Sequence, residues 1–178
     1  MPSPTKIDSS QLPVKTVHKA VYCAVLASFC QGLELIARAS QDEGWDVDLA
    51  KCIKIWRAGC IIQSEAIADM LEPIFANSKS GERIMNMKLI DEVSNELSAT
   101  FPALKEVVLR ATETDQYIPS LSASLEYLKY CGGRMLPTSF MEAQMDFFGA
   151  HNYDRPGVPG EDPGKAKKGA HHYEWRPA

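Results

Sequence analysis

The chain has 178 residues, of which 45% are hydrophobic and 24% are charged. This size and composition are typical of one soluble domain with its own hydrophobic core. A formal net charge of −4 argues against a general nucleic-acid binder, which would carry a basic excess. The five cysteines are an odd number without Cys-x-x-Cys spacing, so they indicate neither a disulfide framework nor a zinc site. We expect all five to lie reduced in apolar helical surroundings, in a cytoplasmic compartment.

Residues 1–13 are expected to form a flexible N-terminus, because they are polar and lack the apolar core of a signal peptide. A first helix is expected from Val14 to Glu43, with Gly44 as its C-terminal stop. It is apolar on nearly every face between Ala20 and Ala39. The stretch Ala20–Ile36 is at the short end of what could cross a membrane, and polar residues interrupt it. We therefore interpret it as the central helix of a soluble bundle, with no membrane partner.

Asp46 is the expected cap of a second helix. That helix carries apolar residues at steps of three and four, namely Leu49, Ile53, Trp56 and Cys60. A break near Gln63 should be followed by a short helix that ends around Pro73, and then by a loop over residues 77–81.

Three further helices are expected between residues 84 and 130. The first follows an amphipathic pattern, namely Ile84, Met87, Ile90, Val93 and Leu97. Pro102 should occupy the first turn of a separate helix. Another helix is predicted from Ser120 to Tyr130 and should be stopped by the glycines at 132 and 133.

A last helix is predicted from Phe140 to Phe148, started by a capping box of Ser139 and Glu142. The helical domain would then span residues 14–151, and the fold class is an all-α bundle. Residues 152–178 are rich in proline and glycine and should be an irregular tail. Its aromatic end, at Tyr173 and Trp175, is expected to dock, and we place it on a partner subunit.

Two segments carry a resemblance to a known family. They read Trp-Arg-Ala-Gly-Cys-Ile-Ile-Gln-Ser over residues 56–64 and Gln-Met-Asp-Phe-Phe-Gly-Ala-His over residues 144–151. With Leu-Pro-Thr-Ser-Phe-Met-Glu-Ala-Gln over residues 136–144 and His-Tyr-Glu-Trp over residues 172–175, they resemble 6-phosphogluconate dehydrogenase. The match is to the second half of the family's C-terminal helical domain and its tail.

The resemblance implies an origin in an NADP-dependent enzyme that decarboxylates a sugar phosphate in the pentose phosphate pathway. The family enzyme opens with a dinucleotide-binding domain, and its catalytic lysine lies outside the half that this chain resembles. The sequence contains no Gly-x-Gly-x-x-Gly, P-loop or nucleophile elbow. We therefore expect a chain without the NADP-binding domain, without cofactor or metal, and without dehydrogenase activity of its own.

Family members have an arginine where this chain has Met145, and in family dimers that arginine and the following histidine help to bind substrate in the neighbouring subunit. By resemblance His151 would keep half of that role. Met145 offers no charge and no bidentate donors to a phosphate. Losing such a partner costs about 2–5 kcal/mol of binding.

Two classes of function stay open. In the first, the chain is a helical dimerisation module that pairs with itself or with a subunit carrying the nucleotide-binding half. In the alternative, it is a repurposed cofactor-free enzyme, such as a lyase, isomerase or cyclase, with an apolar pocket at the dimer interface. That pocket would use His151 as the catalytic acid or base, and its expected substrate-binding residues are Met141, Met145, Phe147, Phe148 and His151.

Two further motifs are interpreted as follows. A metal site at His171, His172 and Glu174 is disfavoured, because adjacent histidines on an irregular chain are seldom ligands together. Trp56 and Arg57 are interpreted as structural residues, with Trp56 packed in the core and Arg57 paired with a carboxylate or a helix end.

Overall fold

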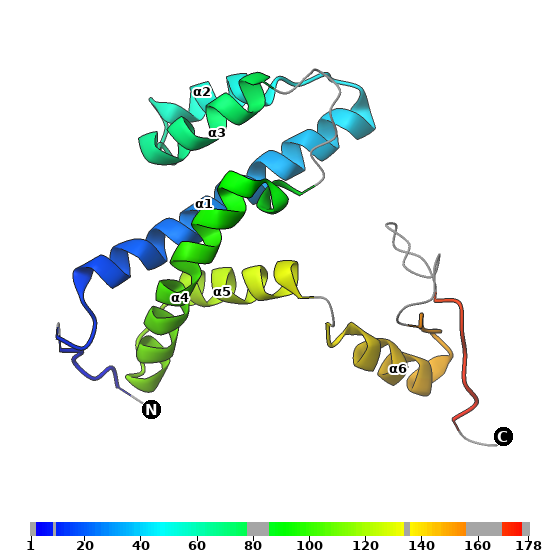
Figure 1. Ribbon diagram of the computed structural model, residues 1–178. Coiled ribbons are helices and arrows are strands. Elements are labelled where there is room, and N and C mark those ends of the chain that lie inside the picture. The colour runs from blue at the N-terminus through cyan, green and yellow to red at the C-terminus, as the bar shows by residue number, and fades with distance from the viewer. Residues whose placement is uncertain (1–2, 9, 78–85, 134–135, 156–168, 176–178) are drawn as a thin grey trace. The chain divides into compact units, whose positions relative to one another are not determined.

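The computed structural model describes residues 3–8, 10–77, 86–133, 136–155 and 169–175. Within these residues the chain is helical, and its one β-pairing is an isolated bridge between Tyr153 and His171. The elements are α1 (Val14–Glu43), α2 (Leu49–Arg57), α3 (Glu65–Asn77), the short 3₁₀ helix η1 (Met87–Leu89), α4 (Asp91–Glu113), α5 (Pro119–Gly132) and α6 (Thr138–Gly149) (Figure 1). The all-α fold predicted from the sequence is confirmed. The chain forms two compact units, Met1–Lys129 and Tyr130–Ala178.

Helix α1 has the bounds predicted from the sequence. It ends because Gly44 adopts a left-handed conformation with φ of 67°, which suits a residue without a Cβ, and donates its backbone N–H to the Ser40 carbonyl. Among the described residues, α1 is the one helix long and apolar enough to cross a membrane. Of its most apolar 18-residue stretch, 44% is buried inside the protein, and core helices of soluble proteins can be equally long and apolar.

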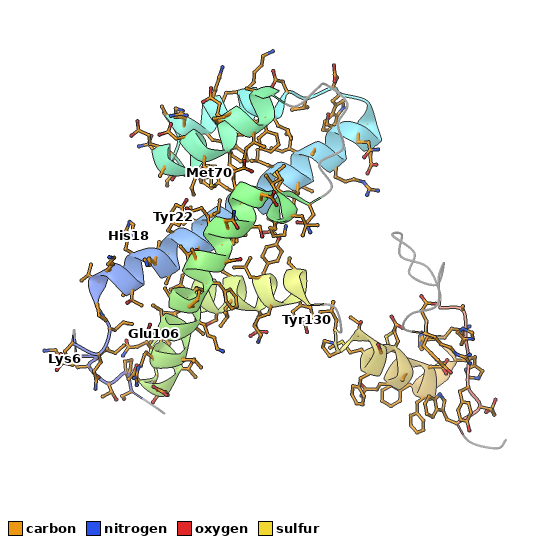
Figure 2. The ribbon with its side chains drawn as sticks, viewed as in Figure 1. Lys6, His18, Tyr22, Met70, Glu106 and Tyr130 are labelled. Atoms are coloured by element: carbon orange, nitrogen blue, oxygen red, sulfur yellow. The ribbon has the colours of Figure 1, made fainter. Side chains whose placement is uncertain are left out.

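In the first unit, α4, η1 and α2 all pack against α1, and α3 pairs with α2 (Figure 1). The core side chains are fully or almost fully buried, and they include Leu26, Leu33, Ile53, Leu71, Met87, Leu104 and Leu125. Partly buried residues such as Tyr22 and Met70, both labelled in Figure 2, pack against this core. The central place predicted for α1 is confirmed, although Val14 and Leu35 remain exposed, so the helix is not covered all round.

The polar interruption at Glu34 in α1 has a structural role. Its Oε1 accepts a hydrogen bond from the Met87 backbone N–H at 2.7 Å, and both carboxylate oxygens lie 2.7 Å from Lys88 Nζ. The Lys88 side chain is 8% exposed, and its ammonium group lies 5.3 Å from the centre of the Tyr127 ring. Burial opposes the charge of Lys88, but the hydrogen bonds to Glu34 and Tyr127 outweigh it and raise the pKa of Lys88.

Three predicted boundaries around α2 and α3 are wrong. Cys60, which the pattern placed on the second helix, lies beyond the end of α2 at Arg57. Asp48, rather than Asp46, caps α2 by accepting the Lys51 backbone N–H, while Asp46 adopts a positive φ of 53° in the preceding turn. Helix α3 continues through Pro73 to Asn77, since the buried Phe75 lies beyond the proline and continues the core-facing stripe. Its packing offsets the hydrogen bond that Pro73 cannot make. Asn77, the first residue of the predicted loop, therefore belongs to α3, and residues 78–81 lie outside the described residues.

A further error concerns Pro102, which lies inside one continuous helix, α4, instead of starting a new one. The buried stripe of α4 includes Leu97, Leu104 and Val107, so burial on both sides of the proline holds the helix together. The predicted amphipathic pattern is divided differently, because Met87 belongs to η1 and α4 starts at Asp91. The expected helical residue Ile84 lies outside the described residues.

Candidate functional site

The second unit is built around α6, which does not start in the predicted way. Its N-cap position is Pro137 and no side chain caps it, so the capping box of Ser139 and Glu142 is not formed. Instead, Glu142 Oε2 accepts a hydrogen bond from the backbone N–H of Asp154, at 3.1 Å. Glu142 therefore holds the segment that follows α6.

Helix α6 has two opposite faces. Steps of three and four place Glu142 and Asp146 on the side that contacts the following chain. The other side is apolar and 42% to 73% exposed, and we call it the apolar face, made of Phe140, Met141, Met145, Phe147 and Phe148. The helix thus buries Asp146, half-buries Glu142 and exposes its large apolar side chains, the reverse of an ordinary surface helix.

Asp146 is the centre of the buried side and is 1% exposed. Its Oδ1 accepts hydrogen bonds from the Asn152 backbone N–H and from His172 Nδ1, each at 2.8 Å. Its Oδ2 accepts the Tyr173 backbone N–H at 3.1 Å and the Trp175 indole Nε1–H at 2.9 Å. Four donors therefore converge on one carboxylate.

The negative charge of Asp146 and the positive charge of His172 stabilise each other. Burial opposes ionisation of Asp146, but the hydrogen bonds from His172, Tyr173, Trp175 and Asn152 prevail and hold the pKa of Asp146 well below its usual range. The carboxylate of Asp146 in turn raises the pKa of His172, and Glu174, with Oε2 at 3.7 Å from His172 Nε2, adds to that effect. The pair therefore favours an ionised Asp146 beside a protonated His172.

Residues 169–175, which we call the strap, run along the chain that follows α6. Tyr153 and His171 exchange two backbone hydrogen bonds, at 2.8 and 2.9 Å, and the Ala170 N–H donates to Asp154 Oδ1 at 2.9 Å. A Cβ added to Gly169 would lie 2.6 Å from the backbone nitrogen of Tyr153, which is too close for any side chain. The strap crosses Tyr153 so closely that position 169 must be a glycine.

A hollow of about 530 Å³ lies beside the strap and the end of α6. It is lined by Glu142, Met145, Ala150, His151, Asn152, Asp154 and Gly169. Two residues that flank His151 have left-handed backbones, Ala150 with φ of 55° and Asn152 with φ of 67°. His151 therefore sits at the tip of a strained turn on the wall of the hollow.

The residues expected to line a pocket at a dimer interface are divided within the single chain. Met145 and His151 line the hollow, whereas Met141, Phe147 and Phe148 do not. Phe147 makes edge-to-face contacts with Phe148 and Trp175, at centroid distances of 5.9 and 6.0 Å. Within the chain, the backbone of Tyr173 and the indole of Trp175 bind Asp146 of α6. The docking of this tail on a partner subunit stays a prediction.

His172, which the sequence offered as a weak metal candidate, is a hydrogen-bond partner of Asp146. Within the part of the chain that the structure describes, no group of three histidine, cysteine or carboxylate side chains could hold a metal ion. Asp146 itself was missed from the sequence. The sequence did offer one signal, the single carboxylate within the apolar run Met-Asp-Phe-Phe. A carboxylate among large apolar residues is rarely buried unless other groups bind it.

Trp56 and Arg57, in the family-like segment 56–64, have the structural role expected of them. The Arg57 guanidinium bridges Asp69 and Glu72 of α3, with Nη2 at 2.9 Å from Glu72 Oε2. Trp56 packs edge-on against Phe29 of α1, with ring centroids 5.6 Å apart. A Cβ added to Gly32 would lie 3.4 Å from the Trp56 ring, so this glycine lets the indole lie close to α1.

Comparison with known structures defines the class of protein to which the fold belongs. The chain is similar to a solved 6-phosphogluconate dehydrogenase of Plasmodium falciparum, studied without ligand, with its cofactor NADP+ and with its substrate 6-phosphogluconate. The TM-score is 0.76 at 30% identity, over 98% of this chain and 34% of that one. The fold is thus that of the all-α part of a dehydrogenase.

The sequence comparisons name the family. The family model described as 6-phosphogluconate dehydrogenase, C-terminal domain, matches residues 2–175, and the chain belongs to this family. It is 67% identical over 162 residues to the decarboxylating 6-phosphogluconate dehydrogenase of Emericella nidulans, which covers 91% of this chain and 32% of the relative. The corresponding enzyme of Synechocystis is 34% identical over 158 residues. The chain spans about a third of the length of these relatives.

Proposed function

We propose that the chain is a helical association module of the 6-phosphogluconate dehydrogenase family, which pairs with a second copy of itself or with a subunit that carries the nucleotide-binding half. The observation that carries this proposal is the apolar face of α6. Five large apolar side chains lie on one side of a helix whose polar side is already occupied by the strap. An exposed apolar surface of this kind is typical of a protein–protein contact.

The comparisons support the family origin of the proposed module. The chain matches the C-terminal domain model and about a third of each relative, and the relatives are named for the complete decarboxylating reaction. A role within such an assembly would link the chain to the pentose phosphate pathway. We expect it to lie in the cytoplasm, with the dehydrogenase subunits that it would join.

The native mass of the 178-residue chain at micromolar concentration tests association. We expect a dimer, and we expect Phe148→Glu to raise its dissociation constant, because a central apolar contact contributes about 2 kcal/mol or more. Ser139→Glu is the matched control, since Ser139 is also exposed on α6 but lies outside the apolar face. A wild-type monomer that also fails to bind a tagged complete family subunit would contradict the proposal.

The hollow beside α6 keeps a repurposed enzyme as a second candidate. It contains Met145 and His151, and at about 530 Å³ it has the size of a small-molecule site. Two carboxylates, Glu142 and Asp154, also line it, which suits an apolar substrate poorly. A turnover that His151→Ala abolishes without changing the native mass would favour this candidate over a module that acts by association alone.

A further inference from the structure

One acceptor group holds two different parts of the second unit. Asp146 Oδ1 binds the backbone of Asn152, in the turn that follows α6, and both carboxylate oxygens bind the strap through His172, Tyr173 and Trp175. The backbone carbonyl of Asp146 also accepts the N–H of Ala150, at 2.9 Å. Asp146 therefore fixes the residues on either side of His151 as well as the strap.

The turn around His151 needs this support. Ala150 and Asn152 both have left-handed backbones, which cost an alanine about 1 kcal/mol or more and an asparagine less. Such a conformation persists only when its surroundings impose it. Here the backbone carbonyl of Asp146 holds the first of these residues and its carboxylate holds the second.

The strap in turn supports the carboxylate. It supplies three of the four donors to a side chain that is 1% exposed. A buried carboxylate that loses its donors must move toward water or take up a proton, because an unpaired buried charge is very costly. Either change weakens the hydrogen bond from Asn152, so release of the strap should loosen the turn on the far side of Asp146.

We infer that Asp146 is a positioning residue for His151, and that the strap must be closed on Asp146 for His151 to keep its place in the hollow. The strap also supplies Gly169 to the wall of the same hollow. Strap, carboxylate and turn thus behave as one closing device. This inference is independent of the proposed association, because every contact in it lies within one chain.

Trp175→Phe is the first test, since it removes one donor from the strap and keeps an aromatic ring. Amide hydrogen exchange and the ring signals of His151 are followed by NMR in the complete chain. We expect the Asn152 amide to exchange about tenfold faster and the His151 signals to shift, although neither residue touches the substituted atom. Trp45→Phe, the same replacement in the first unit, is the matched control and should change neither.

Asp146→Asn is the second test. An amide offers one oxygen, so its NH₂ group must face at least one backbone or indole N–H that can only donate. We expect the amides of Asn152 and Tyr173 to lose protection together, while amides of α4 keep theirs. If Trp175→Phe exposes the Tyr173 amide and leaves Asn152 and His151 unchanged, the strap and the turn are independent and the inference is wrong.

Discussion

Trp175 donates its indole N–H to Asp146, which lies 29 positions earlier in the chain, at a distance of 2.9 Å. The bond connects the end of the strap to the buried side of α6. It also places the Trp175 ring against Phe147, on the edge of the apolar face. The contact that orders the strap therefore extends the surface that we propose for association.

Gly169→Ala should open the strap. The added Cβ would lie 2.6 Å from the Tyr153 backbone, and no flexible side chain is there to move aside. We expect the backbone bonds between Tyr153 and His171 to break and their amide protection to fall. Gly132→Ala is the matched control, because a Cβ there would meet nothing within 4 Å, and it should leave protection unchanged.

Lys88→Met should destabilise the first unit strongly. It leaves the Glu34 carboxylate partly buried without its cation, and breaking a buried ion pair in this way costs about 3–5 kcal/mol. Chemical unfolding, followed by the loss of helical circular dichroism, measures the change. Lys129→Met removes an exposed pair with Glu126 and should cost about 1 kcal/mol or less. Equal losses for the two variants would contradict the importance assigned to Glu34 and Lys88.

The strap should be most firmly closed in mildly acidic solution. The raised pKa of His172 means that its contribution is complete below its ordinary pKa and is lost as the pH rises through the raised value. The lowered pKa of Asp146 means that its contribution is present above its ordinary pKa and is lost as the pH falls through the lowered value. Protection of the Trp175 indole N–H should therefore peak between these two transitions. In His172→Gln the decline at higher pH should disappear.

Among the cysteines of the folded chain, Cys131 should react first with a thiol reagent. It is exposed, whereas Cys23 and Cys30 are buried in α1, so the expectation that all five lie in apolar surroundings is wrong for Cys131. Burial raises the pKa of Cys30 to about 12, which leaves almost no thiolate at neutral pH. Peptide mapping after brief alkylation should find the label at Cys131 and little at Cys23 or Cys30. Unfolding the chain first should make all five react.

Periodicity and end signals predicted most of the fold. The bounds of α1 could be found because an apolar run ends at a glycine, and both signals are local. The errors at Pro73 and Pro102 have one cause, since each proline is a local helix breaker that tertiary packing of residues on both sides overrides. Local signals cannot report that packing.

The site was harder to predict for a related reason. The resemblance pointed to Met145 and His151, and both line the hollow. The importance of Asp146 depends on partners up to 29 residues away, on an irregular segment with no periodicity to place it. The exposure of Phe148 could not be predicted either. On an ordinary amphipathic helix the apolar side faces the core and the carboxylates face solvent.

The order of residues around Asp146 also bears on how the protein is made. Asn152, His172, Tyr173 and Trp175 all follow Asp146 in the sequence, so this carboxylate leaves the ribosome before any of its four donors. Until Trp175 has left the ribosome, the Asp146 carboxylate on one side of α6 lacks its full set of donors. The apolar face on the other side is exposed during the same interval. The second unit must therefore fold after the first, and a chaperone that binds apolar segments would find its best target there during that interval.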